Sequence, residues 1–246
     1  MAGPELMRIA QGVYQVARDP REGGGFVPAA NTYLLGSPAA GDLALVDPGF
    51  AGGGGEILQA LARAGVAPSR LRRVILTHTH LDHLGCLPDL LEAVPGCEVW
   101  AHREEAEPLE RGDERTVYGN RPTEALLRRQ FGLPPGRYRL RVQRKLAAND
   151  TIETAAGPWS VLHTPGHSAG SICLYCSFRE VLISGDTLFS DGAIGRFDMH
   201  GADSQQLQAS LACLAQLAVR RLLPGHGALG SGWPTGSPLR CGPGAG

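Results

Sequence analysis

The stretch VILTHTHLDHLG, residues 74–85, sets three histidines and an aspartate directly after an apolar run of the kind that forms a buried strand. In an extended chain, His78 and His80 are two residues apart, so their side chains point to the same side and both can bind one metal ion. Asp82 and His83 follow where the chain turns toward a helix, so they can face a neighbouring position. Imidazole and carboxylate ligands suit zinc, iron or manganese. The spacing therefore predicts a metal site at the end of a strand.

Three more ligand-type residues stand beside glycine at the ends of predicted strands. They are His167 in TPGHSAGS, Asp186 in ISGDTLF and His226 in LPGHG. Strand ends in α/β folds open into a shared crevice, where such folds build their sites. With the four residues of the opening stretch they make seven candidate ligands, five histidines and two aspartates. Seven ligands of this kind indicate a dinuclear metal site.

Short strands recur in both halves of the chain, with helices between and after them. The sequence predicts strands at 7–17, 31–35, 42–47, 72–76, 97–102, 150–154, 158–164, 170–176 and 180–184, and a short one over the residues RRLLP at 220–224. It predicts helices at 55–65, 83–94 and 204–218, the last with Asp203 or Ser204 as its N-cap. This pattern favours an α/β sandwich of two packed sheets with helices outside.

The order of these motifs resembles that of the metallo-β-lactamase superfamily, over residues 8–227. The resemblance implies a four-layer αβ/βα sandwich with a dinuclear site along one edge between the sheets. It also implies how the ligands divide. One metal would be held by His78, His80 and His167, the other by Asp82, His83 and His226, and both by the bridging Asp186.

The reaction that this resemblance implies is hydrolysis. Two metals ~3.5–4 Å apart polarise the substrate and bring the pKa of a bound water from 15.7 to about 7, so a metal-bound hydroxide is the expected nucleophile. Asp82 would orient that water or accept its proton, and it is the expected catalytic residue. We expect two zinc ions per chain, with iron or manganese as other metals that suit the ligands. The expected substrate is a small molecule, namely a thioester, a lactone or a related ester, with side activity toward phosphoesters or β-lactams.

Comparison with the branches of the superfamily narrows the class of hydrolase that this chain resembles. B3-type β-lactamases share the His-x-His-x-Asp-His segment but lack the bridging aspartate, which this chain has at Asp186. The run GDTLFSDGAIGRFD, residues 185–198, is similar to glyoxalase II, the hydroxyacylglutathione thioesterase. Larger glyoxalase II enzymes carry a helical C-terminal domain, whereas only 20 residues follow His226 here, and the usual final helix is hard to find among them. The class is therefore glyoxalase II-like, and the substrate stays open.

Segment 103–145 resembles an insertion, because it sets His83 and His167 84 positions apart. Part of it, TEALLRRQFG, is predicted as a helix that stops at Gly132. Between Arg121 and Lys145 the segment has eight basic residues and one acid. We expect a helical lid over the metals that favours an anionic substrate. The alternative is that these arginines lie on a solvated helix or hairpin.

Two other functions remain open at this point. Persulfide dioxygenases resemble glyoxalase II closely, use one iron, and can retain the second ligand set, so an oxidoreductase is the first alternative. Some superfamily members are nucleases, which is the second. The basic stretch 121–145 is the one feature that favours a nuclease, and no aromatic stacking motif accompanies it. We therefore do not expect nucleic acid to be the substrate.

A few polar residues near the motifs are not expected to bind metal. His102 ends a strand and is expected at the surface. His163 precedes the TPGH motif and is either a neighbour of the ligands or a packed strand residue. Arg196 and Asp198 resemble a structural ion pair near the site.

Composition excludes several classes of protein. The net charge of −1 favours neither a nucleic-acid binder nor a membrane-surface protein, and no apolar run approaches the roughly 18–20 residues of a membrane span. Six cysteines in 246 residues and an N-terminus without a signal pattern indicate a cytoplasmic protein. Residues 1–226 are interpreted as a single domain with the insertion at 103–145. Residues 227–246, rich in Gly, Pro and Ser, are expected to form a mobile tail, whose atypical form leaves apolar surface that suits a homodimer.

Overall fold

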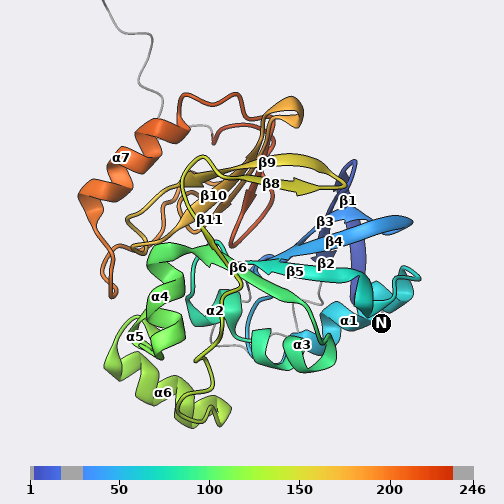
Figure 1. Cartoon of the computed structure of the whole chain (residues 1–246). Coiled ribbons are helices and arrows are strands. Elements are labelled where there is room, and N and C mark those ends of the chain that lie inside the picture. The colour runs from blue at the N-terminus through green and yellow to red at the C-terminus, as the bar shows by residue number, and fades with distance from the viewer. Residues whose placement is uncertain (1–2, 18–29, 235–246) are drawn as a thin grey trace, which may run out of the picture.

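Two β-sheets pack face to face, and helices cover their outer faces (Figure 1). The structure is a computed structural model, and it describes residues 3–17 and 30–234. Residues 18–29, between two predicted strands, and the end of the predicted tail, 235–246, lie outside the described residues.

The first sheet has seven strands in chain order. The first four pair antiparallel, and the fourth to the seventh pair parallel. In order they are β1 (Glu5–Ala10), β2 (Val13–Ala17), β3 (Tyr33–Ser37), β4 (Ala40–Val46), β5 (Leu71–Ile75), β6 (Glu98–His102) and β7 (Arg144–Leu146). Because parallel strands end at the same edge, the stretch after β5 meets the residues that follow β4 and β6 there.

The second sheet has five strands in the order β12-β11-β10-β9-β8. They are β8 (Thr151–Thr154), β9 (Gly157–His163), β10 (Ile172–Cys176), β11 (Val181–Gly185) and β12 (Arg221–Pro224). β11 and β12 are parallel, while the other neighbours are antiparallel. The chain therefore leaves β11 and β12 at one shared edge, with Asp186 and His226 just beyond.

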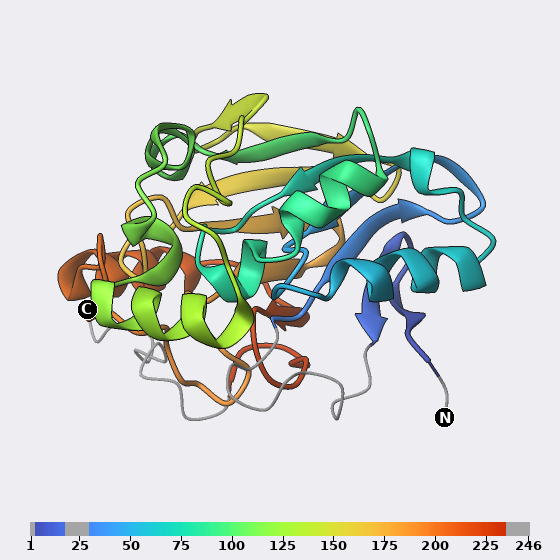
Figure 2. The same cartoon turned by 90° about the horizontal axis from the view of Figure 1, so that it is seen from below.

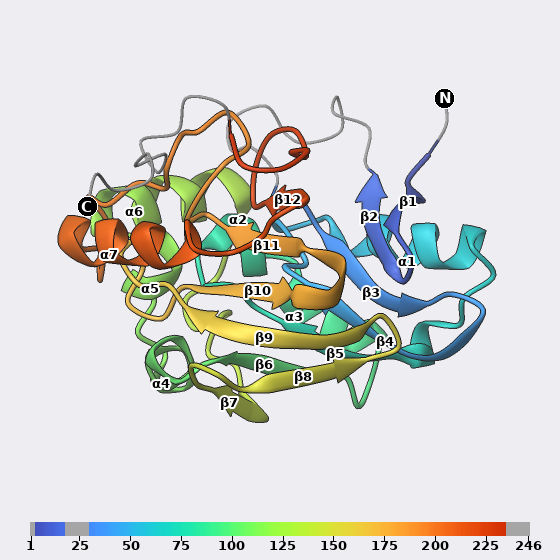
Figure 3. The same cartoon turned by 90° about the horizontal axis from the view of Figure 1, so that it is seen from above.

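The helices complete four layers. On the outer face of the first sheet lie α1 (Gly54–Arg63), α2 (Leu81–Leu84) and α3 (Leu87–Ala93) (Figure 2). Helix α7 (Ser204–Leu214) packs Leu207, Leu211 and Leu214 on the outer face of the second sheet (Figure 3). The space between the sheets is filled by apolar side chains that include Tyr33 and Trp159. The predicted four-layer αβ/βα sandwich is confirmed.

Two predicted elements are in fact broken, each for a local reason. The predicted strand 7–17 is the hairpin β1–β2, which turns at Gly12, where φ is +73° and favours glycine. The predicted helix 83–94 is the pair α2 and α3. Pro88 lies in the first turn of α3 and has no N–H to bond with the carbonyl of Leu84, so the first helix cannot continue into the second. The predicted helix 204–218 ends at Leu214, and its N-cap is Asp203.

Segment 103–145 contains the helices α4 (Arg103–Arg111), α5 (Arg115–Tyr118) and α6 (Arg121–Phe131), followed by an irregular stretch and β7. Helix α6 ends at Gly132 as predicted, with φ at +61°. Several of the segment's basic side chains have acidic partners. The pairs are Arg128 with Glu114 and Glu124, Arg137 with Asp89, and Lys145 with Glu110. Part of the basic charge is therefore neutralised locally.

Two short 3-10 turns, η1 (Pro68–Arg70) and η2 (Ser177–Arg179), complete the elements. After β12 the described residues 227–234 contain no helix, and Gly230 pairs with Leu222 in an isolated bridge. Among the described residues, none of the helices has both the length and the apolar character to cross a membrane.

Candidate metal centre

All seven candidate ligands lie at one edge between the two sheets, although they come from four separate stretches. The first stretch follows β5, and its Thr77 carbonyl accepts a hydrogen bond from Ile172 N of the second sheet at 2.9 Å. His167 lies in the loop between β9 and β10, while Asp186 and His226 follow β11 and β12. In the view from above, the end of β11 lies over α2, which carries Asp82 and His83 (Figure 3).

The first group consists of His78, His80 and His167, all buried, with ligand atoms within 4.8 Å of one another. His80 Nδ1 lies 2.9 Å from His167 Nε2, and His167 Nε2 lies 3.3 Å from His78 Nε2. Three imidazole nitrogens therefore converge on one small volume.

The second group consists of Asp82, His83, Asp186 and His226, with ligand atoms again within 4.8 Å of one another. His226 Nε2 lies 2.9 Å from Asp82 Oδ2 and 3.3 Å from His83 Nε2. Asp186 reaches both groups. Its Oδ1 lies 3.2 Å from His83 Nε2, and its Oδ2 lies 3.7 Å from His167 Nε2.

Hydrogen bonds behind the first group fix which ring nitrogens carry hydrogen. His167 Nδ1 donates to the Arg196 carbonyl at 2.7 Å. Thr77 Oγ1 donates to Asp47 Oδ2 at 2.7 Å, so it accepts from His78 Nδ1 at 3.1 Å. This network leaves Nε2 of both His78 and His167 without hydrogen, and the two lone pairs face each other at 3.3 Å. Two facing acceptors repel unless a cation lies between them, so the donor set fits a metal ion.

The histidines of the first group are neutral at pH 7. Burial and the neighbouring histidines lower the pKa of His78 well below its usual range. Burial, and then the charge of His167, lower the pKa of His80 to about 3. Burial also lowers the pKa of His167. Neutral imidazole is the form that binds metal, so this group can take up an ion with little competition from protons.

The histidines of the second group titrate differently from those of the first, because the second group contains two carboxylates. Burial opposes a charge on His83, but nearby carboxylates, first among them Asp186, raise its pKa well above the usual range. Burial likewise opposes a charge on His226, yet hydrogen bonds to Asp186 and Asp82 raise its pKa to about 9. Burial would raise the pKa of Asp186, but the two histidines hold it well below its usual range. A metal that binds here must displace imidazole protons, so its affinity rises with pH.

Asp47 is a functional residue that sequence reasoning missed. It follows β4, is buried, and accepts from His83 Nδ1 at 2.9 Å and from Thr77 N at 2.8 Å. These contacts turn Nε2 of His83 toward the other ligand atoms of the second group. Its φ of +52° is in the left-handed region, which costs free energy for a residue other than glycine. The signal was present in LALVDPG, where an acid again stands at a strand end, here two positions before a glycine.

Two glycines let the backbone approach the ligands closely. A Cβ at Gly225 would lie 2.1 Å from Asp186 Oδ1 and 2.7 Å from His83 Cε1. A Cβ at Gly195 would lie 1.9 Å from the Asp186 carbonyl oxygen and 2.9 Å from His167 Nδ1. Both positions therefore exclude any side chain while the ligands keep these places.

Two of the histidines that were not predicted as ligands form a separate pair. His102 is buried, so its predicted surface position is wrong. Its ring stacks on that of His163 with centroids 3.9 Å apart, because β6 and β9 face each other across the sandwich. His163 Nε2 donates to the Ala169 carbonyl at 3.0 Å, in the loop that carries His167. Arg196 and Asp198 form the expected ion pair, which is exposed.

Comparison with known proteins agrees with this geometry. The sequence model described as the Metallo-beta-lactamase superfamily matches residues 25–226. The chain belongs to the metallo-β-lactamase superfamily. It is a metallo-hydrolase of that superfamily, with two groups of candidate metal-binding histidines and aspartates.

Two curated relatives within the superfamily carry informative names. The acyl-coenzyme A thioesterase MBLAC2 of Gallus gallus is 31% identical over 162 residues, which are 62% of this chain and 55% of the relative. The hydroxyacylglutathione hydrolase GloC of Haemophilus influenzae is 29% identical over 168 residues, which are 68% of this chain and 71% of the relative.

Two solved structures have the same fold. The BLEG-1 B3 metallo-β-lactamase superposes with a TM-score of 0.65 at 28% identity, covering 82% of this chain and 91% of that one. The protein TTHA1623, solved in a di-iron-bound form, superposes with a TM-score of 0.62 at 31% identity, covering 83% and 94%.

Proposed function

We propose that this chain is a dinuclear metal-dependent hydrolase that cleaves thioesters. The observation that carries the proposal is the convergence of two ligand groups on either side of Asp186, whose carboxylate oxygens reach into both. A metal in each group, bridged by one carboxylate, is the arrangement used for hydrolysis at two-metal sites.

The proposed division of the ligands follows the two groups. His78, His80 and His167 would hold one metal, Asp82, His83 and His226 would hold the other, and Asp186 would contribute to both. The metals themselves would lower the pKa of water and polarise the substrate's carbonyl oxygen. Zinc is the proposed metal, because the five imidazoles and two carboxylates are all among its usual ligands.

Asp82 is the proposed catalytic residue. Its carboxylate is the most accessible acid of the set, with 22% of the side chain exposed against 10% for Asp186. One oxygen, Oδ2, contacts His226 Nε2 at 2.9 Å. The carboxylate can therefore orient an attacking water and accept its proton at the open side of the centre.

A thioester is the substrate class that the relatives favour. The names of both relatives described above denote thioesterases, one for acyl-coenzyme A and one for hydroxyacylglutathione. Both of those thioesters carry anionic groups. The arginines of α6 that have no ion-pair partner among the described residues, Arg121 and Arg129, are candidates to attract such a substrate.

Metal analysis joined to a substrate panel tests this proposal. We expect two zinc ions per purified chain and turnover of acyl-coenzyme A or acylglutathione thioesters above that of lactones, phosphoesters and β-lactams. The variants Asp186→Ala and His80→Ala should both abolish turnover, while Asp198→Ala, in the exposed ion pair, should leave it unchanged. One iron per chain with oxygen consumption on glutathione persulfide would instead identify a dioxygenase. Near wild-type turnover in either ligand variant with metal bound would show that the ligands are assigned wrongly.

A further inference from the structure

Glu105 is a buried acid that lies outside both ligand groups. It stands in the first turn of α4 and is 2% exposed. Its carboxylate accepts three hydrogen bonds from two separate stretches of chain. The donors are Thr79 Oγ1, Ser168 Oγ at 2.5 Å and Gly170 N at 3.0 Å.

Two of these donors are chain neighbours of proposed metal ligands. Thr79 stands between His78 and His80, and Ser168 directly follows His167. One carboxylate therefore joins the loop of two ligands to the loop of the third, and it does so where His80 Nδ1 and His167 Nε2 are 2.9 Å apart.

The fit between α4 and the His167 loop is close. A Cβ at Gly170 would lie 2.6 Å from Glu105 Cγ and 2.8 Å from Glu105 N, so only glycine permits this approach. Between the two Glu105 contacts, the carbonyl of Ala169 accepts from His163. The loop is thus held at three successive residues, Ser168, Ala169 and Gly170.

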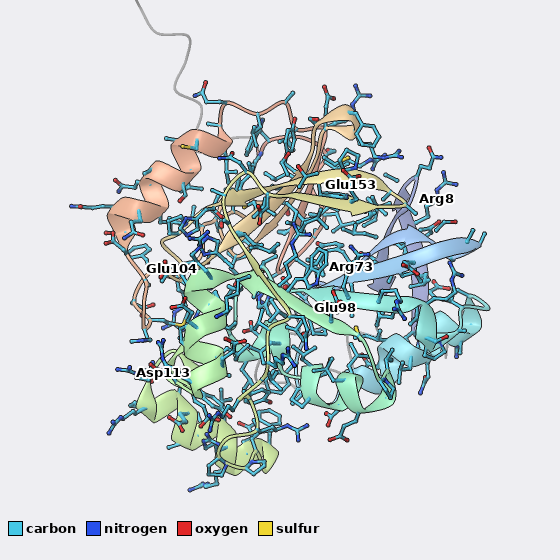
Figure 4. The ribbon with its side chains drawn as sticks, in the orientation of Figure 1. Arg8, Arg73, Glu98, Glu104, Asp113 and Glu153 are labelled. Atoms are coloured by element: carbon cyan, nitrogen blue, oxygen red, sulfur yellow. The ribbon has the colours of Figure 1, made fainter. Side chains whose placement is uncertain are left out.

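The neighbouring acid Glu104 provides an internal comparison. It lies in the same first turn of α4, where the helix dipole favours negative charge at either position. Glu104 is exposed, and Figure 4 shows it at the start of α4, beside the loops of the second sheet. A favourable interaction with the helix dipole is therefore available to both acids, but among the described residues only the carboxylate of Glu105 accepts hydrogen bonds from the ligand loops.

We infer that Glu105 is a positioning residue that sets the distance between the His78–His80 stretch and His167, and so tunes metal affinity at the first group. The inference rests on the metal centre of the proposed function. Partners that hold metal ligands from behind typically contribute 10–100-fold to metal affinity. The role depends on hydrogen-bond acceptance and shape, since no cation pairs with Glu105 among the described residues.

Chelator-competition titrations with Zn²⁺ and the absorption spectrum of the Co²⁺-loaded protein test this role. We expect Glu105→Ala to raise the dissociation constant of the metal site formed by the first group by roughly 10–100-fold and to shift the Co²⁺ bands. Glu105→Gln should stay close to wild type, because its oxygen can serve Ser168 and Gly170 while its amide donates to the Thr79 hydroxyl. The matched control Glu104→Ala should change neither readout.

Each other outcome overturns the inference. Wild-type affinity and spectrum in Glu105→Ala would show that the contacts do not position the ligands. Equal losses in Glu105→Gln and Glu105→Ala would assign the effect to charge. If Glu105→Ala fails to fold, the variant Thr79→Val, which removes one of the three donors to Glu105, is measured by the same two readouts. An unchanged Zn²⁺ dissociation constant and an unchanged Co²⁺ spectrum in that variant would count against the positioning role. A wild-type chain that binds no metal overturns the proposed function as well, whereas normal binding in both wild type and variants overturns only this inference.

Discussion

At Gly225, the absence of a Cβ atom allows the metal ligands to take the places they have in the candidate centre. The position directly precedes His226, and a Cβ there would collide with the carboxylate of Asp186 and the ring of His83. Both neighbours are buried and held by several contacts, so they cannot move away without leaving their groups.

Gly225→Ala is therefore expected to weaken metal binding without unfolding the chain. Displacement of Asp186 disturbs both groups, and we expect metal affinity to fall by roughly 10–100-fold, with a matching loss of turnover. Isothermal titration with Zn²⁺ measures the first effect. Gly227→Ala is the control, because φ at Gly227 is +75° but nothing lies within 4 Å of its Cβ position. Equal losses in the two variants would attribute the effect to a general disturbance of the loop around His226 and not to the collision.

His102 is expected to make stability depend on pH. Burial, His163 and Arg103 lower its pKa to about 4, whereas in the unfolded chain it titrates near its usual value of about 6.5. Below about pH 6.5 the unfolded chain takes up a proton that the folded chain refuses, so stability falls as the pH drops toward 4. We predict that metal-free wild type loses more unfolding free energy than His102→Asn between pH 7.5 and 5 in urea titrations.

The variant His102→Asn isolates the contribution of His102 titration to the pH dependence of stability for two reasons. Asparagine can still cap α4, where His102 now accepts from Glu104 N, and the metal ligands titrate equally in both proteins. Identical pH dependence in wild type and variant would contradict the assigned role of His102.

The ligand-type residues could be recognised in the sequence, whereas Glu105, which contacts two of the ligand loops, could not. His167, Asp186 and His226 each stand beside glycine at a strand end, which is a local pattern. Glu105 has no such pattern, because its partners lie 26 and 63 positions away and only the packing of α4 brings them together. The burial of His102 was missed for the same reason, since its partner His163 comes from the other sheet.

At the level of elements, the beginning of helix α7 is determined by the side chain of the residue that caps it. Asp203 Oδ1 accepts from the backbone N–H of Gln205 and Gln206 at 2.8 and 3.0 Å, and so caps α7. The sequence left Asp203 and Ser204 as equal candidates, because both residue types cap helices and a shift of one position changes neither pattern.

Asp203→Ala is predicted to destabilise the protein by about 1 kcal/mol, the usual contribution of an N-cap side chain. Ser204→Ala should have little effect, since the Ser204 side chain is exposed within the first turn. Chemical denaturation of the two variants beside wild type measures the difference. A larger loss in Ser204→Ala would place the cap one residue later than the structure does.

Strand and helix breaks were harder to predict than helix caps. The run 7–17 has strand-like residues throughout, and only the turn at Gly12 reveals two strands. The apolar spacing of 83–94 suits one helix, yet Pro88 divides it. In both cases a single residue with special backbone requirements overrides the periodicity of its neighbours.

At the scale of the whole molecule, the candidate centre joins the two halves of the sandwich. The first sheet supplies the ligands of the opening motif, and the second sheet supplies His167, Asp186 and His226. Alternation of strands and helices was enough to predict two sheets with helices outside. The substrate could not be predicted, because it depends on the surfaces around the centre, and no local motif encodes those surfaces.

The central claim is that two metals held between the sheets perform hydrolysis. It is tested most directly by titrating chelator-stripped protein with Zn²⁺ while thioester hydrolysis is followed. The account predicts no turnover in the stripped protein and activity that rises to a plateau at two equivalents per chain. Full turnover without metal, or a plateau at two equivalents that survives Asp186→Ala, would contradict it.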